Sequence, residues 1–467
     1  MNKKLLIAGV CLAMAGFVCA QTKRGGISPQ MLSEIQKSVA NGTADKALFN
    51  AMASNSIDNL ARNHANSGAV DGYFSVETKK QNIQDQKSSG RCWMFSGMNV
   101  LRSDFALRTD SLTLEYSHVY LAFWDQLEKA NLFLQGVIET AKKPIDDPKV
   151  RFFFKAPLND GGTFCGIIDL ADKYGLVPKE AMPETYSAEN TSRMSRLISS
   201  KLREYGLQLR RMVGEGRKAD AINAEKTKML STVYRMLALS LGEPVKTFSY
   251  AFKNKDGKAV TPLKTYTPQS FFKETVGESL DGRYIMLMND PRRPYYKTYE
   301  IEYDRHTYDG HNWKYLNLPM DEVAEVAVAS LKAGHKMYSS YDVGKQLDRT
   351  RGYSDLDNYD YGTLFGVKFG MNKAERIDTY DSGSTHAMTL TAVDLDANGK
   401  PVKWKVENSW GATNGHNGCI IMTGRWFNEY MFRLVVDTQF VSEKIRTMAE
   451  QKPTMLTQDD PLFSLDD

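Results

Sequence analysis

The feature that most constrains the fold is a pair of strand-like runs joined by a tight turn. The runs AMTLTAVDL (387–395) and VKWKVEN (402–408) flank the turn residues DANGK, and this order predicts an antiparallel hairpin. The runs YEIEY (299–303) and KYLNLPM (314–320) add strand patterns in the same half of the chain. Helical patterns dominate the earlier half, so we expect an α+β fold.

Length and composition indicate a globular protein of several units. The chain has 467 residues, of which 42% are hydrophobic and 25% charged, as in ordinary soluble proteins. We expect the following organisation: a signal peptide over 1–20, an N-terminal segment over 21–80, a helical lobe over 81–187, an inserted helical and mixed subdomain over 188–330, a β-rich lobe over 331–441, and a C-terminal arm over 442–467.

The first twenty residues have the pattern of a cleavable export signal. Lys3 and Lys4 precede an apolar run over 5–17, and small residues end the segment at Ala20. This run is too short for a membrane span. We therefore expect a periplasmic or secreted protein. Lipidation at Cys19 is the disfavoured alternative, because bulky residues precede that cysteine.

Charge and cysteine content exclude several classes of function. Loss of Lys3 and Lys4 lowers the number of Lys and Arg residues from 60 to 58, against 56 acidic residues, which leaves a mature net charge of +2. This balance predicts no nucleic-acid partner. The mature cysteines are far apart, so neither a disulfide framework nor a zinc site is expected, and the sequence predicts no cofactor. They are Cys92, Cys165 and Cys419.

Cys92 is a candidate nucleophile. It follows SSGR and opens a helical pattern in which Met94, Met98, Leu101 and Phe105 mark one buried face. The first turn of a helix favours a thiolate through unpaired N–H groups and the helix dipole. The plainer interpretation is a small buried hydrophobic residue.

A nucleophilic thiol needs a base, and the hairpin offers one. His386 opens the first strand and Asn408 closes the second, with the midpoint of their numbers at Ala397, inside the turn. We therefore expect them to be cross-strand neighbours. The amide of Asn408 can then fix the imidazole ring, and Trp410 can shield their hydrogen bond. Taken singly, His386 could be a satisfied strand-end histidine and Asn408 a turn residue.

Gln86 lies six residues before Cys92. Its side-chain amide is a candidate donor to the oxyanion that forms when the thiol attacks a carbonyl group, together with the backbone N–H of Cys92. A lone glutamine in a loop carries little information by itself.

Several stretches together resemble the bleomycin hydrolase and aminopeptidase C family, a branch of the papain-like cysteine peptidases. The similarity spans roughly residues 70 to 467. The stretches are QKSSGRCWMFSGMN, THAMTLTAV, VENSWG, YLAFWDQLEKAN (120–131), DGGTF (160–164), KYGLVPKE (173–180), YDVGK (341–345) and LDNYDYGTLFG (356–366).

The resemblance implies a papain-like two-lobe fold and a thiol-dependent aminopeptidase. It assigns Cys92 as nucleophile, His386 as acid and base, Asn408 as orienting residue and Gln86 as oxyanion donor. It also implies that Gly161 and Gly162 form a turn that presents backbone to an extended peptide, and that the protein is a homohexamer. An endopeptidase and a nucleic-acid-binding or scaffolding hexamer are the alternatives.

The chain departs from the family at three points. Family members are typically cytosolic, Phe164 and Cys165 stand where relatives tend to carry Gln and Trp, and the chain ends in the acidic tail DDPLFSLDD. Two X–Pro steps disfavour helix in the arm, so we expect an extended arm along the cleft. There its terminal carboxylate, at Asp467, would bind the free amine of a peptide substrate.

Overall fold

The computed structural model describes residues 25–39, 42–109 and 112–463. These form two compact units that meet in the sequence at Arg62 and Asn63. The first unit holds three helices, α1 (Pro29–Lys37), α2 (Thr43–Ser54) and α3 (Ile57–Ala61). A new N-cap at Ser56 separates α2 from α3. The predicted signal peptide lies outside the described residues.

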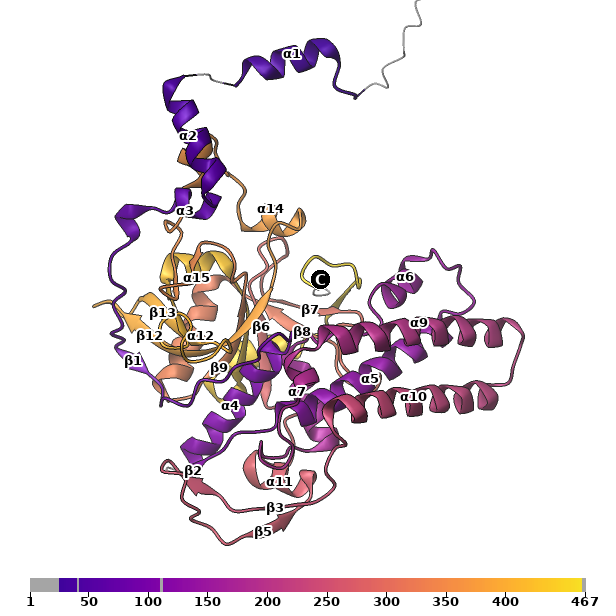
Figure 1. The fold of residues 1–467 in the computed structure, drawn as a ribbon. Coiled ribbons are helices and arrows are strands. Elements are labelled where there is room, and N and C mark those ends of the chain that lie inside the picture. Colours follow the sequence, from indigo (N-terminus) through magenta and orange to yellow (C-terminus); the bar gives the residue numbers. More distant parts are fainter. Residues whose placement is uncertain (1–24, 40–41, 110–111, 464–467) are drawn as a thin grey trace, which may run out of the picture. The chain divides into compact units, whose positions relative to one another are not determined.

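Helices fill the earlier part of the second unit, as predicted. The long helices α5, α9 and α10 lie side by side (Figure 1) and pack around Leu134, Leu202 and Val233. The α-helices of this unit are α4 (Cys92–Thr109), α5 (His118–Glu139), α6 (Pro148–Lys155), α7 (Phe164–Tyr174), α8 (Tyr186–Glu189), α9 (Ser192–Gly214), α10 (Ala219–Leu241), α11 (Pro268–Thr275), α12 (Met320–Lys332), α13 (Tyr361–Phe365), α14 (Lys373–Asp378), α15 (Gly424–Tyr430) and α16 (Glu443–Ala449).

One mixed sheet organises the later part. Its strands follow the order β10-β11-β14-β13-β12-β9-β15-β6-β8-β7-β16, and β1 pairs with β12 outside this path. These strands are β1 (Val76–Glu77), β6 (Tyr284–Met288), β7 (Lys297–Ile301), β8 (Lys314–Asn317), β9 (Met337–Tyr341), β10 (Leu347–Asp348), β11 (Tyr353–Ser354), β12 (His386–Leu395), β13 (Pro401–Glu407), β14 (Cys419–Thr423), β15 (Met431–Asp437) and β16 (Thr454–Leu456). Two small pairs stand apart, β2 (Leu112–Thr113) with β4 (Lys253–Asn254) and β3 (Phe248–Tyr250) with β5 (Lys264–Tyr266).

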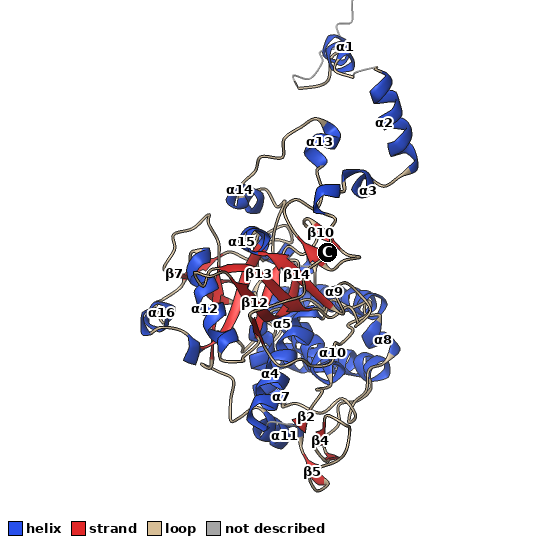
Figure 2. Ribbon diagram, turned by 90° about the vertical axis from the view of Figure 1, so that its left-hand side faces the viewer, coloured by secondary structure: helices blue, strands red, loops and turns tan. Residues whose placement is uncertain are grey.

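The two faces of the sheet bury two different cores. Along β15, Phe432 and Val435 belong to the core shared with α4 and α7, whereas Leu434 and Val436 belong to the core shared with α12 and α15. Leu434, Val435 and Val436 alternate between the two cores, as the two-residue period of a strand requires, whereas Phe432 breaks this alternation at an irregularity near the start of the strand. Figure 2 shows α12 and α15 beside the red strands. The sheet is therefore covered on both faces, in agreement with the predicted α+β class.

Helix α4 is buried on every side over residues 93–105, which corrects the prediction of one buried face. Its buried polar side chains have hydrogen-bond partners. Asn99 and Arg102 both donate to Glu407 on β13, and the carboxylate of Asp104 accepts from His335. Charge pairing therefore permits a polar face to lie against the sheet.

The C-terminal arm is only partly extended. Its first part is the helix α16, which ends before Lys452 and Pro453, and its next part is the strand β16, parallel to β7. The prediction of an extended arm therefore holds only after residue 450, because the prolines that disfavour helix lie beyond that point. Within the described residues, no helix has the length and apolar character that a membrane crossing requires.

Candidate active site

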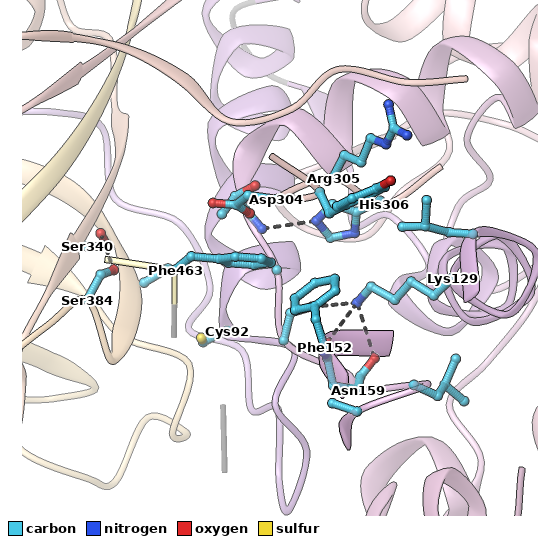
Figure 3. Close-up of a pocket in the computed structure, with 18 of the residues that line it drawn as sticks. Cys92, Lys129, Phe152, Asn159, Asp304, Arg305, His306, Ser340, Ser384 and Phe463 are labelled. Atoms are coloured by element: carbon cyan, nitrogen blue, oxygen red, sulfur yellow. Dashed lines mark hydrogen bonds between the residues drawn. The ribbon is translucent and has the colours of Figure 1, made fainter. Parts of the chain in front are cut away.

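The site forms where the start of α4 meets the hairpin of β12 and β13. Cys92 is the first residue of α4 and is partly exposed. It lines a pocket of about 110 Å³ together with His386, the first residue of β12. Figure 3 shows the Cys92 sulfur at this pocket. The fold thus brings together two residues that are nearly 300 positions apart in the sequence.

The imidazole of His386 is held by Asn408. The His386 Nε2 atom lies 2.8 Å from Asn408 Oδ1. An amide oxygen only accepts hydrogen bonds, so Nε2 carries the proton and Nδ1 is the unprotonated nitrogen. Within the described residues Nδ1 makes no hydrogen bond. It is therefore the ring atom that can accept a proton from a thiol.

The register of the hairpin differs from the predicted one, although the predicted contact is present. Thr389 pairs with Glu407, and continuing that register places Met388 opposite Asn408. His386 is consequently the diagonal neighbour of Asn408, two residues along the same face. The turn is centred on Asn398 and not on Ala397, since Asp396 N–H donates to Lys400 O. Two irregularities in the ladder cancel each other before Thr389 is reached.

Burial determines the charge of His386. The side chain is only 8% exposed, and this burial, aided by the positive charge of Arg349, lowers the pKa of His386 to about 4 against the opposing effect of the Asn408 hydrogen bond. The ring of Trp410 lies 4.9 Å from the imidazole, centroid to centroid. Trp410 therefore lies next to the histidine, where it was predicted to shield the hydrogen bond to Asn408. The low pKa of His386 makes the imidazole neutral at neutral pH.

Gln86 is tied to the segment that carries Asn408. Its backbone N–H donates to Ser409 O at 2.8 Å, and its side-chain Oε1 accepts from the Ser409 hydroxyl. The Nε2 amide group donates one hydrogen bond to Ser89 O. Among the described residues, Gln86 is not part of the pocket lining, so its role as oxyanion donor stays a prediction.

Gly161 and Gly162 both line the pocket beside Cys92. The carbonyl of Gly161 accepts a hydrogen bond from Lys129 Nζ at 2.6 Å. A side chain at Gly162 would collide with the rings of His306 and Trp93. The turn thus has the close approach that glycine allows, and its contact with substrate stays a prediction.

The loop between β7 and β8 contributes residues that the sequence did not single out. Asp304, Arg305 and His306 of this loop line the same pocket (Figure 3). Burial raises the pKa of Asp304, although the nearby Arg433 opposes this effect. These residues stand in a stretch without a recognisable motif, so only their spatial neighbours reveal them.

The arm also reaches this pocket. The side chain of Phe463 lines it and lies beside Phe152, with ring centroids 5.7 Å apart (Figure 3). Arg433 Nη2 donates to the carbonyl of Leu462 at 2.7 Å. Asp467, which the sequence analysis names as a substrate contact, lies outside the described residues.

The two unusual residues after the glycine turn belong to the core. Phe164 is fully buried against Tyr284 and Tyr338. The thiol of Cys165 is buried as well, and burial raises its pKa well above the ordinary value. Neither side chain lines the pocket among the described residues, and Cys165 does not have the environment of a reactive thiol.

A helix-start cysteine and a sheet-borne histidine held by an asparagine are the elements of a papain-like cysteine peptidase, and comparisons with known proteins agree. The model of the Peptidase C1-like family matches residues 26–463. The chain therefore belongs to this family and has its papain-like fold.

Named relatives match along nearly their whole length. The chain is 37% identical to aminopeptidase C of Lactobacillus delbrueckii subsp. lactis, covering 93% of this chain and 96% of that one. It is 38% identical to human bleomycin hydrolase, covering 84% and 88%. The crystal structure of PepW from Lactobacillus rhamnosis HN001 superposes with a TM-score of 0.89 at 36% identity, covering 94% of this chain and 99% of that one.

Proposed function

We propose that this protein removes residues from the free N-terminus of peptides through an acyl-enzyme formed on Cys92. Its class, a thiol-dependent aminopeptidase of the papain-like C1 family, agrees with relatives named aminopeptidase C. One observation carries the residue assignment. The hydrogen bond from His386 to Asn408 leaves the Nδ1 atom of His386 available at the pocket that Cys92 lines.

The reaction then proceeds in two halves. His386 Nδ1 takes the thiol proton as the Cys92 sulfur attacks the carbonyl carbon, and the imidazolium returns this proton to the leaving amine when the C–N bond breaks. A water molecule, deprotonated by His386, next cleaves the thioester and restores the thiol. The Cys92 backbone N–H and the Gln86 amide are the proposed donors to the oxyanion.

The arm is the proposed reason for cleavage at the N-terminus. Phe463 occupies part of the pocket, and the preceding turn is anchored by ion pairs from Asp460 to Arg292 and Arg293. Because Asp460 is buried and its two partners are partly buried, the arm has a fixed point close to the pocket. An arm held in this position shortens the space before the scissile bond, and its terminal carboxylate at Asp467 would bind the α-ammonium group.

A matched pair of peptides tests this function. One peptide carries a free N-terminus and the other an N-acetyl group. The full-length protein should release the first residue of the free peptide only, and Cys92→Ala should abolish release. Deleting residues 464–467 should allow cleavage of the acetylated peptide. If the shortened protein rejects that peptide as firmly as the full-length protein, the arm does not determine the specificity.

Export and a homohexameric assembly are further parts of the proposal. Export is supported by the basic, apolar and small-residue pattern of residues 1–20. The hexamer is supported by the family resemblance. N-terminal sequencing of the native protein should begin at or near Gln21, and sedimentation should give six times the mass of one chain. An intact Met1 would contradict export. A monomer at micromolar concentration would contradict the hexamer.

A further inference from the structure

His306 is a second histidine of the pocket, and the catalytic steps above do not use it. It lies on the loop between β7 and β8 and is 2% exposed. Its Nε2 atom accepts the backbone N–H of Thr163 at 3.1 Å, and its Nδ1 atom lies 2.5 Å from Asp125 Oδ1. Since Nε2 accepts, Nδ1 carries the proton and donates to the carboxylate.

Lys129 connects the same carboxylate to the glycine turn. Its Nζ atom lies 3.0 Å from Asp125 Oδ2 and donates to the carbonyl oxygens of Gly161 at 2.6 Å and Asn159 at 3.1 Å. The turn over 159–163 is thus held at both of its ends. Lys129 holds its carbonyl groups, and His306 holds the N–H group of Thr163.

The imidazole of His306 also fills the space beneath the turn. A side chain at Gly162 or at Gly166 would collide with this ring. The ring packs 4.4 Å, centroid to centroid, from the indole of Trp93, the residue that follows Cys92. His306 therefore joins the turn to the helix start beside the nucleophile, in addition to the hydrogen bonds that Asp160 accepts from Trp93 Nε1 at 2.9 Å and from Gly90 N–H at 2.7 Å.

We propose that His306, Asp125 and Lys129 form a positioning network that sets the backbone of residues 159–163 for binding the peptide substrate. This inference rests on the proposed peptidase function. His306 acts through the turn and takes no part in proton transfer, because both of its ring nitrogens already have partners. Loss of the network should therefore weaken substrate binding and leave the reactivity of Cys92 unchanged.

Two substitutions of His306 provide the first test. His306→Gln keeps one acceptor and one donor, whereas His306→Leu removes both. We expect His306→Leu to raise KM on the order of ten- to hundredfold, as a small misplacement of a binding group does, and His306→Gln to restore most of the loss. The rate of Cys92 alkylation by iodoacetamide should equal that of the wild type in both variants.

Lys129→Met provides a second test that leaves the His306 contacts in place, and Lys173→Met on α7 is its matched control. Lys173 pairs with Glu128 and Asp309 and is not among the described residues that line the active-site pocket. Lys129→Met should raise KM and Lys173→Met should not. Unchanged KM in both His306→Leu and Lys129→Met, or an alkylation rate that falls together with kcat, would overturn the proposal.

Peptide binding to Cys92→Ala separates this inference from the proposed function. In that background, His306→Leu should weaken the binding of an unlabelled peptide by the same factor as it raises KM. If the wild type hydrolyses no peptide, the proposed function fails, and the binding measurement still decides whether the network positions the turn. Equal peptide binding by Cys92→Ala and by the double variant Cys92→Ala/His306→Leu would overturn the network even if the wild type is active.

Discussion

Two histidines line one pocket, and their partners differ. His386 donates to the neutral amide of Asn408 and keeps Nδ1 without a hydrogen bond in the described part of the chain, whereas His306 donates to the carboxylate of Asp125 and accepts from Thr163 N–H. The ring of His386 is fixed by one hydrogen bond and keeps an available lone pair on Nδ1. The ring of His306 is fixed by two hydrogen bonds and keeps no available lone pair.

This difference separates a base from a structural element. An amide orients an imidazole without adding a negative charge, so burial can keep the pKa of His386 low. A carboxylate at position 408 would favour the imidazolium form of His386. The presence of a histidine in a pocket therefore predicts no role. Its role follows from how many of its ring nitrogens have hydrogen-bond partners and from the charge of those partners.

Replacing His386 should give the largest effect. His386→Ala removes the proton acceptor, and we expect kcat/KM to fall by at least about a thousandfold, as in other enzymes whose catalytic residues act as a unit. His306→Gln, assayed in parallel by peptide release, should remain within about tenfold of the wild type. Similar losses in the two variants would remove the distinction between the histidines.

Replacing Asn408 should give an intermediate effect. Asn408→Ala leaves the imidazole in place without its orienting partner, so we expect kcat/KM to fall by roughly 10- to 100-fold. The expected loss is smaller than for His386→Ala because orientation is lost but the base is kept. A loss as large as that of His386→Ala would assign a more direct role to the asparagine.

Asn408→Asp would give His386 a carboxylate partner, as His306 has in Asp125. The new carboxylate should raise the pKa of His386. In the wild type the acid limb of kcat/KM should lie near the His386 pKa of about 4, because the unprotonated ring accepts the thiol proton. The limb should move to higher pH in Asn408→Asp, which a pH series of initial rates measures. An unmoved limb would show that another group sets it.

The smallest effect should appear in stability. The folded pKa of His386 lies below its ordinary value of 6.5, so the unfolded chain binds more protons between pH 6.5 and about 4. Stability attributable to His386 is therefore full above pH 6.5 and is lost as the pH falls toward 4. His386→Gln should flatten the decline in the free energy of unfolding over this window, measured by urea denaturation. A parallel decline in both proteins would contradict the assignment.

Local patterns predicted much of the fold and part of the site. The hairpin, the helix that begins at Cys92 and the contact of His386 with Asn408 follow from residue periodicity, turn residues and position, and the structure contains all three. The diagonal pairing within the hairpin did not follow, because the turn residues alone do not show that the hairpin is centred on Asn398 and not on Ala397. The predicted domain boundaries stay predictions.

Other features depend on contacts between distant segments. The polar side of α4 is buried because Glu407 arrives from a strand some 300 residues later. His306 is one of the seven histidines of the chain and stood in no distinguishing pattern, and its partners Asp125 and Thr163 come from two other elements. Chemistry that is assembled from three segments is not visible in any one of them.

Ser409 has a consequence for how the site tolerates change. Its backbone N–H donates to Asn408 Oδ1 at 2.8 Å, and its hydroxyl donates to Gln86 Oε1, 323 positions away in the sequence. One small residue therefore helps to orient two amide groups, together with Ser89 O at Gln86 and His386 at Asn408, although an amide has nearly the same shape in either orientation. Ser409→Ala would remove the hydroxyl contact to Gln86 and keep the backbone N–H contact to Asn408, so damage at this position would reach the proposed oxyanion donor and spare the orientation of the base.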